Sequence, residues 1–211
     1  MNYPLKKGNK NMPNWCYNQT VFYGDTQKLK EVFDKVEQKI YKKTGKFESI
    51  SLDPLLIELG CPQESLNKEF WIRGHIVDID LLDKGEIILS YETAWNPVYE
   101  TIETILETYC PQIKSVTICE ECGCEIYVNT DKERKYFKDE YYLDIVTGVD
   151  SIYGEHYNGM HYHQTIETVV AELKDIFEVK QELTTFEEVE NFLNSLDDED
   201  VYITFEKFTL D

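Results

Sequence analysis

The sequence lacks long apolar runs, and this excludes a membrane-spanning helix. No stretch approaches the roughly 18 consecutive apolar residues that such a helix needs. The lysines near the start have no apolar run behind them, so a secretory signal is not expected. The sequence also lacks a glycine-rich phosphate loop, so it gives no support for nucleotide binding. It has no H-E-x-x-H motif, which is the zinc-binding motif of many metalloproteases. We expect a soluble, cytoplasmic protein.

Positive charge is also scarce. The chain has 21 lysines and arginines against 41 acidic residues, a net charge of −20. Residues 1–47 hold ten lysines and four acids, whereas the other 164 residues carry a net charge of −26. A surface this negative repels the phosphate backbone, so we do not expect direct binding to nucleic acid. The charge predicts instead a basic protein partner.

The first part of the chain alternates strand and helix patterns. Strands are expected at 16–23, 69–82, 86–95, 113–119 and 124–130, with helices at 26–45 and 97–109. Asn96 is the expected cap of the second helix, and 47–69 is expected to be a connection with one helical turn. The order β-α-β-β-α-β with a final hairpin predicts an α+β fold: a ferredoxin-like split βαβ sandwich with an antiparallel sheet.

The pattern changes after residue 130. A strand or hairpin is expected within 135–146, a loop rich in glycine, tyrosine and histidine at 151–165, and a helix at 165–179. Thr185, three residues before Glu188, predicts a capping box at the start of a second helix, and 201–210 predicts a closing strand. We therefore expect an N-terminal arm at 1–11, a ferredoxin-like domain at 12–130, and an extension at 131–211 packed on that domain.

Three stretches carry a resemblance to a known family. They are MPNWCYNQTVFYG at 12–24, FWIRGHIVDID at 70–80 and YETAWNPVYETIETI at 91–105. Together they resemble the YubB-like ferredoxin-like domain family of phage and plasmid proteins, from residue 12 to about 127. The resemblance implies a fold and a mobile-element setting, because the family has no settled activity. Where relatives have E-E-G-M-G-F, this chain has C-E-E-C-G-C-E-I-Y, so the thiols belong to this branch.

The cysteines of the segment ICEECGCEIYVNT predict metal chemistry. Cys119, Cys122 and Cys124 fall within six residues, and a reducing compartment favours metal binding over disulfides. The Cys-x-x-Cys-Gly spacing is typical of a zinc knuckle, which needs four ligands in all. His161 and His163 supply further donors, with His156 in reserve. We predict a structural Zn²⁺ bound by four of Cys119, Cys122, Cys124, His161 and His163.

Three other interpretations of these residues stay open. Cys119 can be a buried strand residue, with Cys122 and Cys124 as turn thiols and the histidines in a solvated loop. A redox pair is disfavoured because a strand follows the cysteines, whereas redox Cys-x-x-Cys pairs usually begin a helix. A catalytic zinc with Glu120 or Glu121 as the base is the third interpretation.

Two functions follow from these features. The first is an inhibitor that binds a basic partner, namely an anti-CRISPR or similar counter-defence protein that blocks nucleic-acid loading on a nuclease of a host defence system. The alternative is a zinc-dependent enzyme acting on a nucleotide or nucleic acid. The negative charge favours the binding protein over the enzyme.

Overall fold

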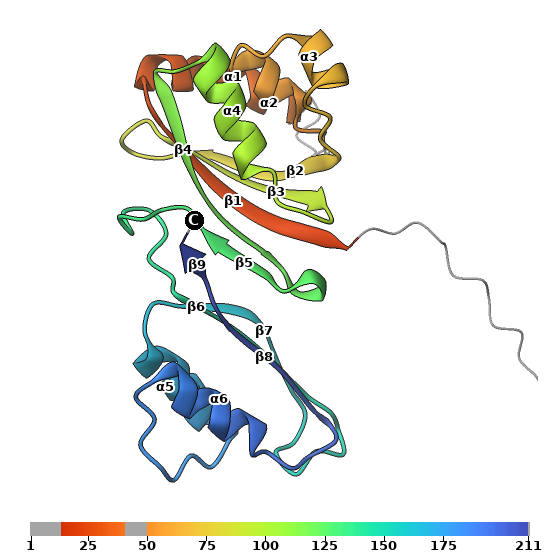
Figure 1. The fold of residues 1–211 in the computed structure, drawn as a ribbon, viewed down its shortest axis with the longest axis vertical. Coiled ribbons are helices and arrows are strands. Elements are labelled where there is room, and N and C mark those ends of the chain that lie inside the picture. Colours follow the sequence, from red (N-terminus) through yellow and green to blue (C-terminus); the bar gives the residue numbers. More distant parts are fainter. Residues whose placement is uncertain (1–13, 41–49, 211) are drawn as a thin grey trace, which may run out of the picture. The chain divides into compact units, whose positions relative to one another are not determined.

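The computed structural model describes residues 14–40 and 50–210 (Figure 1). The chain divides into two compact units, Met1–Ile126 and Tyr127–Asp211, whereas the sequence places the division after residue 130. The arm expected at 1–11 lies outside the described residues, as does the end of the first predicted helix. The predicted α+β class is confirmed, with six α-helices and two sheets in the described part of the chain.

The first unit contains four strands and four α-helices among its described residues, and a fifth strand begins at its end. In chain order they are β1 (Trp15–Gly24), α1 (Thr26–Ile40), α2 (Asp53–Glu58), α3 (Gln63–Lys68), β2 (Gly74–Leu81), β3 (Ile87–Ala94), α4 (Tyr99–Tyr109), β4 (Ile113–Glu121) and β5 (Ile126–Asn129). A 3-10 turn, Cys122–Cys124, joins β4 to β5. The described part of the connection between α1 and β2, from residue 50 on, thus holds two short helices rather than the single turn expected.

The second unit contains a smaller sheet and two helices. After β5, its elements are β6 (Tyr141–Thr147), β7 (His156–His163), α5 (Ile166–Ile176), α6 (Phe186–Asn194), β8 (Val201–Lys207) and β9 (Thr209–Leu210). The three-stranded sheet has the order β7-β6-β8, with both pairs antiparallel. The loop predicted at 151–165 is wrong: residues 156–163 form β7, because pairing with β6 satisfies a backbone whose own sequence signal is weak.

The larger sheet has the strand order β2-β3-β1-β4-β5-β9. β1 is central to its first four strands and pairs antiparallel with β3 and β4, while β2 pairs antiparallel with β3. β5 and β9 run parallel, so the sheet is mixed and not wholly antiparallel as predicted. The reason is that β9 comes from the far end of the chain, where sequence periodicity gives no information about its neighbour.

The core of the first unit lies between its helices and one face of β1 to β4 (Figure 1). Apolar residues at helical spacing on α1 supply one side, and alternate residues of β2 and β3 supply the other. The largest fully buried members include Phe22, Leu29, Leu55, Ile76, Ile87 and Tyr91.

The core of the second unit is separate and lies between α5, α6 and the smaller sheet. Val169 and Leu173 of α5 are fully buried in it, as is Val189 of α6. The predicted capping box is confirmed, because Thr185 accepts the Glu188 amide N–H and the Glu188 side chain accepts backbone N–H groups in return. This cap fixes where α6 begins against the core.

A buried polar network joins two of the stretches singled out in the sequence, 12–24 and 91–105. Asn18 is fully buried, and its Nδ2 donates to Cys16 O at 2.8 Å and to Thr93 Oγ1 at 3.1 Å. Thr93 Oγ1 in turn donates to Asn96 O at 2.7 Å, and the Trp95 amide donates to Asn14 O at 2.8 Å. These motif residues therefore hold the start of β1 against the end of β3.

The same network explains why the predicted cap of α4 is wrong. The N-cap of α4 is Val98, which makes no side-chain cap, and Asn96 lies before it as the acceptor for Thr93. Trp95 has a φ of 74°, a left-handed conformation that is uncommon for a bulky residue. The chain reverses sharply at this point, so the helix begins later than the local sequence indicates.

We expect Asn18→Ala to lower the free energy of unfolding by about 1–3 kcal/mol, because it leaves buried polar partners unsatisfied. Urea unfolding followed by circular dichroism measures this loss. The matched control is Gln19→Ala, since the Gln19 side chain leaves the opposite face of β1 and is only half-buried. Equal losses in the two variants would contradict the structural role of the Asn18 network.

Candidate metal centre and acidic layer

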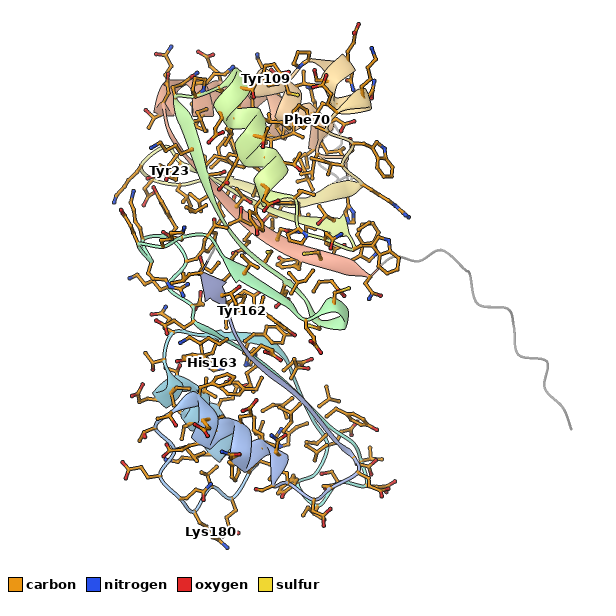
Figure 2. The ribbon with its side chains drawn as sticks, viewed as in Figure 1. Tyr23, Phe70, Tyr109, Tyr162, His163 and Lys180 are labelled. Atoms are coloured by element: carbon orange, nitrogen blue, oxygen red, sulfur yellow. The ribbon has the colours of Figure 1, made fainter. Side chains whose placement is uncertain are left out.

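A cluster of two histidines and one glutamate lies within the second unit. His161 and His163 are two residues apart on β7, so both side chains leave the same face of the strand. Tyr162, between them, leaves the other face and contacts Phe208, with 5.5 Å between ring centroids. His163, labelled in Figure 2, lies on the face of the smaller sheet that α5 covers, and α5 carries Glu172.

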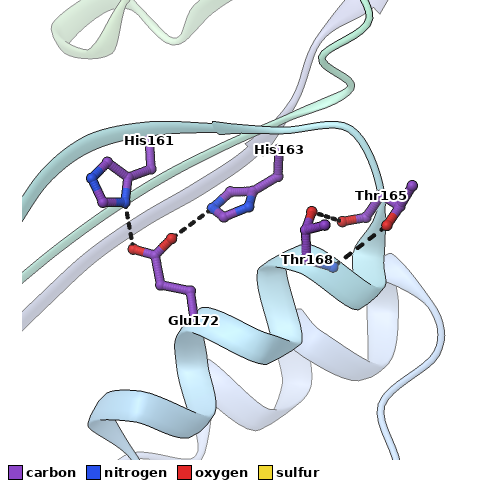
Figure 3. A network of polar contacts seen from close by, with 5 residues as sticks. All are labelled: His161, His163, Thr165, Thr168 and Glu172. Carbon is purple, nitrogen blue, oxygen red and sulfur yellow. Dashed lines mark hydrogen bonds and ion pairs between the residues drawn. The ribbon is translucent and has the colours of Figure 1, made fainter.

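The three side chains converge closely. His161 Nδ1 lies 2.8 Å from Glu172 Oε1, and His163 Nε2 lies 2.9 Å from Glu172 Oε2 (Figure 3). One potential ligand atom from each residue lies within 4.8 Å of the others. The exposed fractions of the side chains are 46% for His161, 9% for His163 and 15% for Glu172. The cluster is therefore closed on one side and open to solvent at His161.

The start of α5 fixes the position of Glu172. Thr165 is the N-cap and its hydroxyl accepts the Thr168 amide N–H, while the Thr168 hydroxyl donates back to Thr165 O at 2.7 Å (Figure 3). Because this cap follows His163 by only two residues, strand and helix are joined by a short, hydrogen-bonded corner. Glu172 is thereby held two turns into the helix, above the histidines.

Burial controls the protonation of His163. Its pKa is lowered from 6.5 mainly by burial, which outweighs the opposing effect of the Glu172 charge. The charges of His161 and Asp139 act in opposite directions, the first lowering and the second raising the pKa. The neutral imidazole is therefore favoured, and this is the form that coordinates metal ions.

The cysteines of the predicted zinc site belong to the first unit. Cys119 is buried in β4, opposite Asn18 of β1, whereas Cys122 and Cys124 are exposed in the 3-10 turn. Cys119 is therefore a buried strand residue, and Cys122 and Cys124 are exposed turn residues. His161 and His163 lie in the second unit, so the mixed cysteine and histidine site stays a prediction, and His156 begins β7 opposite Thr147.

Glu121 accepts a hydrogen bond at the turn that holds Cys122 and Cys124. The donor is the Gly123 amide N–H, 3.0 Å from Glu121 Oε1. A hydrogen bond to Glu121 is the main cause that raises the pKa of the Cys124 thiol. Glu120 and Glu121 are themselves 2% and 5% exposed, an unsuitable position for a base that must reach a substrate.

Glu172 is the site residue that the sequence analysis missed. It precedes the buried Leu173 by one residue and follows the buried Val169 by three, so the helical period places it at the edge of the apolar stripe. An acidic residue at that edge, following two histidines at strand spacing, was the available signal. A loop at 151–165 has no defined face, so an expected loop there hides this signal.

Negative charge is concentrated in the second unit. Residues 127–211 contain 21 acids and seven bases, a net charge of −14, against −6 for residues 1–126. Residues 167–200, which we call the acidic layer, hold 12 acids and two lysines, a net charge of −10. The layer includes α5 and α6, and its exposed acids include Asp175, Glu178, Glu182, Glu187, Glu190 and Glu199. Lys180, at the tip of the loop between the helices, pairs with Glu178 (Figure 2).

Comparison with known proteins adds no assignment. No protein-family model, no curated protein and no solved structure matches this chain. Within residues 14–40 and 50–210, none of the helices is both long and apolar enough to cross a membrane.

After treatment with a chelator, the native protein should react with a thiol reagent at Cys122 and Cys124, and at all six cysteines after unfolding. Glu121→Gln should speed labelling of Cys124, because removing the carboxylate lowers the thiol pKa and the thiolate is the reactive form. Mass spectrometry of labelled peptides measures both effects. Glu125→Gln is the matched control, and equal rates in the two variants would contradict the role of Glu121.

Proposed function

We propose that the protein is a counter-defence inhibitor that binds a basic protein surface, most specifically an anti-CRISPR that prevents nucleic acid from loading on a guide-RNA nuclease of the host. The observation that carries the proposal is the net charge of −10 on residues 167–200. This function requires no direct contact with nucleic acid and no membrane. It places the protein in the host cytoplasm.

The exposure of the acidic layer supports this function. Glu182 lies between α5 and α6, and Glu187 and Glu190 lie on α6, all with exposed side chains. Residues three apart on a helix have Cβ atoms about 5–6 Å apart, so Glu187 and Glu190 are neighbours on the surface of α6. Such neighbouring carboxylates compete with phosphates for the lysines and arginines of a nucleic-acid channel, where the positive charge is held in place before either ligand arrives.

The first unit supports the mobile-element setting. We propose that it is a ferredoxin-like domain of the YubB-like family. Its elements β1, α1, β2, β3, α4 and β4 follow the split βαβ order, and the sheet order β2-β3-β1-β4 is the one expected of that fold. The resemblance residues Asn18 and Thr93 are hydrogen-bonded to each other, which gives the shared motif a structural role.

In the proposed function, a bound metal ion stabilises the fold and does not contact the partner. A structural Zn²⁺ stabilises the fold, whereas the contact with the partner is made by exposed carboxylates. Removing the metal should therefore affect inhibition only through the stability of the protein.

We expect the triple variant Glu182→Gln, Glu187→Gln, Glu190→Gln to bind its target nuclease about tenfold more weakly at low salt. Exposed ion pairs contribute about 0.5 kcal/mol each, and about 1.4 kcal/mol corresponds to a factor of ten. The measurement is loss of target-DNA binding, by fluorescence anisotropy, for a panel of guide-loaded nucleases at increasing inhibitor concentration. The unmodified protein should block one of them at an equimolar ratio, less effectively as salt rises.

The matched control removes the same number of carboxylates from the first unit. Glu100, Glu103 and Glu107 are exposed on α4, and their change to glutamine should leave inhibition unchanged. Equal inhibition by the acidic-layer variant, the α4 variant and the unmodified protein would show that the acidic layer is not the contact surface. Failure to block any guide-loaded nuclease would overturn the proposed target class.

A further inference from the structure

We propose that His161, His163 and Glu172 form a binding site for a divalent transition-metal ion of the Zn²⁺ type, without any cysteine ligand. In the described part of the chain, these residues make up the group of metal-binding side chains whose ligand atoms lie within 4.8 Å of one another. The inference differs from the zinc prediction made from the sequence, because it replaces thiolates by a carboxylate. It does not depend on the proposed inhibitor function.

The backbone presents the ligands before any ion arrives. Alternate positions on β7 direct both imidazoles to one side, and the pairing of Tyr141 with His163 and Leu143 with His161 fixes their register. The capped start of α5 holds Glu172 against them from the opposite layer (Figure 3). The three groups come from two rigid elements, as a preorganised metal site requires.

The distances suit a small ion. In a tetrahedral site with bonds of about 2.1 Å, neighbouring ligand atoms are roughly 3.4 Å apart. The present distances are 2.8 Å from His161 Nδ1 to Oε1 and 2.9 Å from His163 Nε2 to Oε2, so the histidines contact different oxygens of Glu172. An ion would replace these two contacts once side-chain rotation moves the nitrogens about half an ångström from these oxygens and draws the three ligand atoms, now within 4.8 Å of one another, around one point.

The ligand types and surroundings favour a borderline transition metal. Two imidazoles with one carboxylate form a nitrogen and oxygen set that suits Zn²⁺, Co²⁺ or Fe²⁺, whereas Ca²⁺ and Mg²⁺ prefer oxygen ligands alone. The negative charge of residues 167–200, which include Glu172, attracts a cation to this part of the protein. Three protein ligands leave one coordination position for water, on the side where His161 is exposed.

The alternative is that Glu172 simply accepts two hydrogen bonds from the imidazoles. That arrangement accounts for the contacts but needs no ion, and the titration below separates the two cases. A bare hydrogen-bonded cluster binds no stoichiometric metal, whereas the proposed site binds one ion per chain.

The test uses the full chain, stripped with a chelator, and titrated with Zn²⁺ by calorimetry and with Co²⁺ by visible absorption. We expect one equivalent to bind. Bound Co²⁺ should show d–d bands without the intense near-ultraviolet charge transfer that thiolate ligands produce. Glu172→Gln and His161→Ala should each weaken binding about tenfold or more, since the loss of a supporting residue alone usually costs that much.

The matched control is the double variant Cys122→Ser, Cys124→Ser, which should bind both ions as tightly as the unmodified protein. Circular dichroism of each variant verifies that it is folded, and His161 is a suitable position because its side chain is nearly half exposed. Absence of stoichiometric binding would overturn the inference. So would thiolate charge transfer, or loss of binding in the cysteine variant, either of which would favour the mixed cysteine and histidine site instead.

Discussion

Buried polar groups must find partners, and the first unit is organised around this requirement at its central strand. Asn18 and Thr20 point from β1 into the side of the sheet that the helices cover, where an unpaired polar group would cost about 1–3 kcal/mol. Thr20 meets Tyr91 Oη at 3.0 Å and Thr117 Oγ1 at 2.7 Å, so it joins β1 to both of its neighbours. The apolar core can then close around strands whose register is already specified by these hydrogen bonds.

The second unit combines a small apolar core, which favours folding, with a high net negative charge, which opposes folding. Its core rests on residues such as Val169, Leu173 and Val189, while the two helices and the loops beside them each carry half of the 12 acids of the acidic layer. Repulsion among the carboxylates opposes folding, and local hydrogen bonds offset part of it. Glu188 accepts backbone N–H groups in the capping box, and Asp198 accepts the Asp200 amide N–H at 2.9 Å and the Ser151 hydroxyl at 2.8 Å. These hydrogen bonds lower the pKa of both carboxyl groups.

The same charge links the two proposals for this protein. Exposed carboxylates on α6 suit a basic protein surface, and the partly buried Glu172 on α5 suits a cation held by two histidines. The difference lies in solvation: an exposed carboxylate keeps its water and contributes to long-range attraction, whereas a half-buried one gains most from a direct ligand. One acidic segment can therefore provide both a docking surface and a metal site.

The sequence alone was enough to predict most of the elements, the capping box of α6 and the overall negative charge, because these features depend on residue spacing and composition over a few turns. It did not determine that 156–163 would be a strand, that Asn96 would accept from Thr93 rather than cap α4, or that β9 would run parallel to β5. Which side chains meet depends on the folded units: Glu172 lies against His161 and His163, and Cys119 is buried. The physical reason is that packing and hydrogen bonding across the whole unit decide which distant strands pair. Local periodicity in the sequence does not predict this pairing.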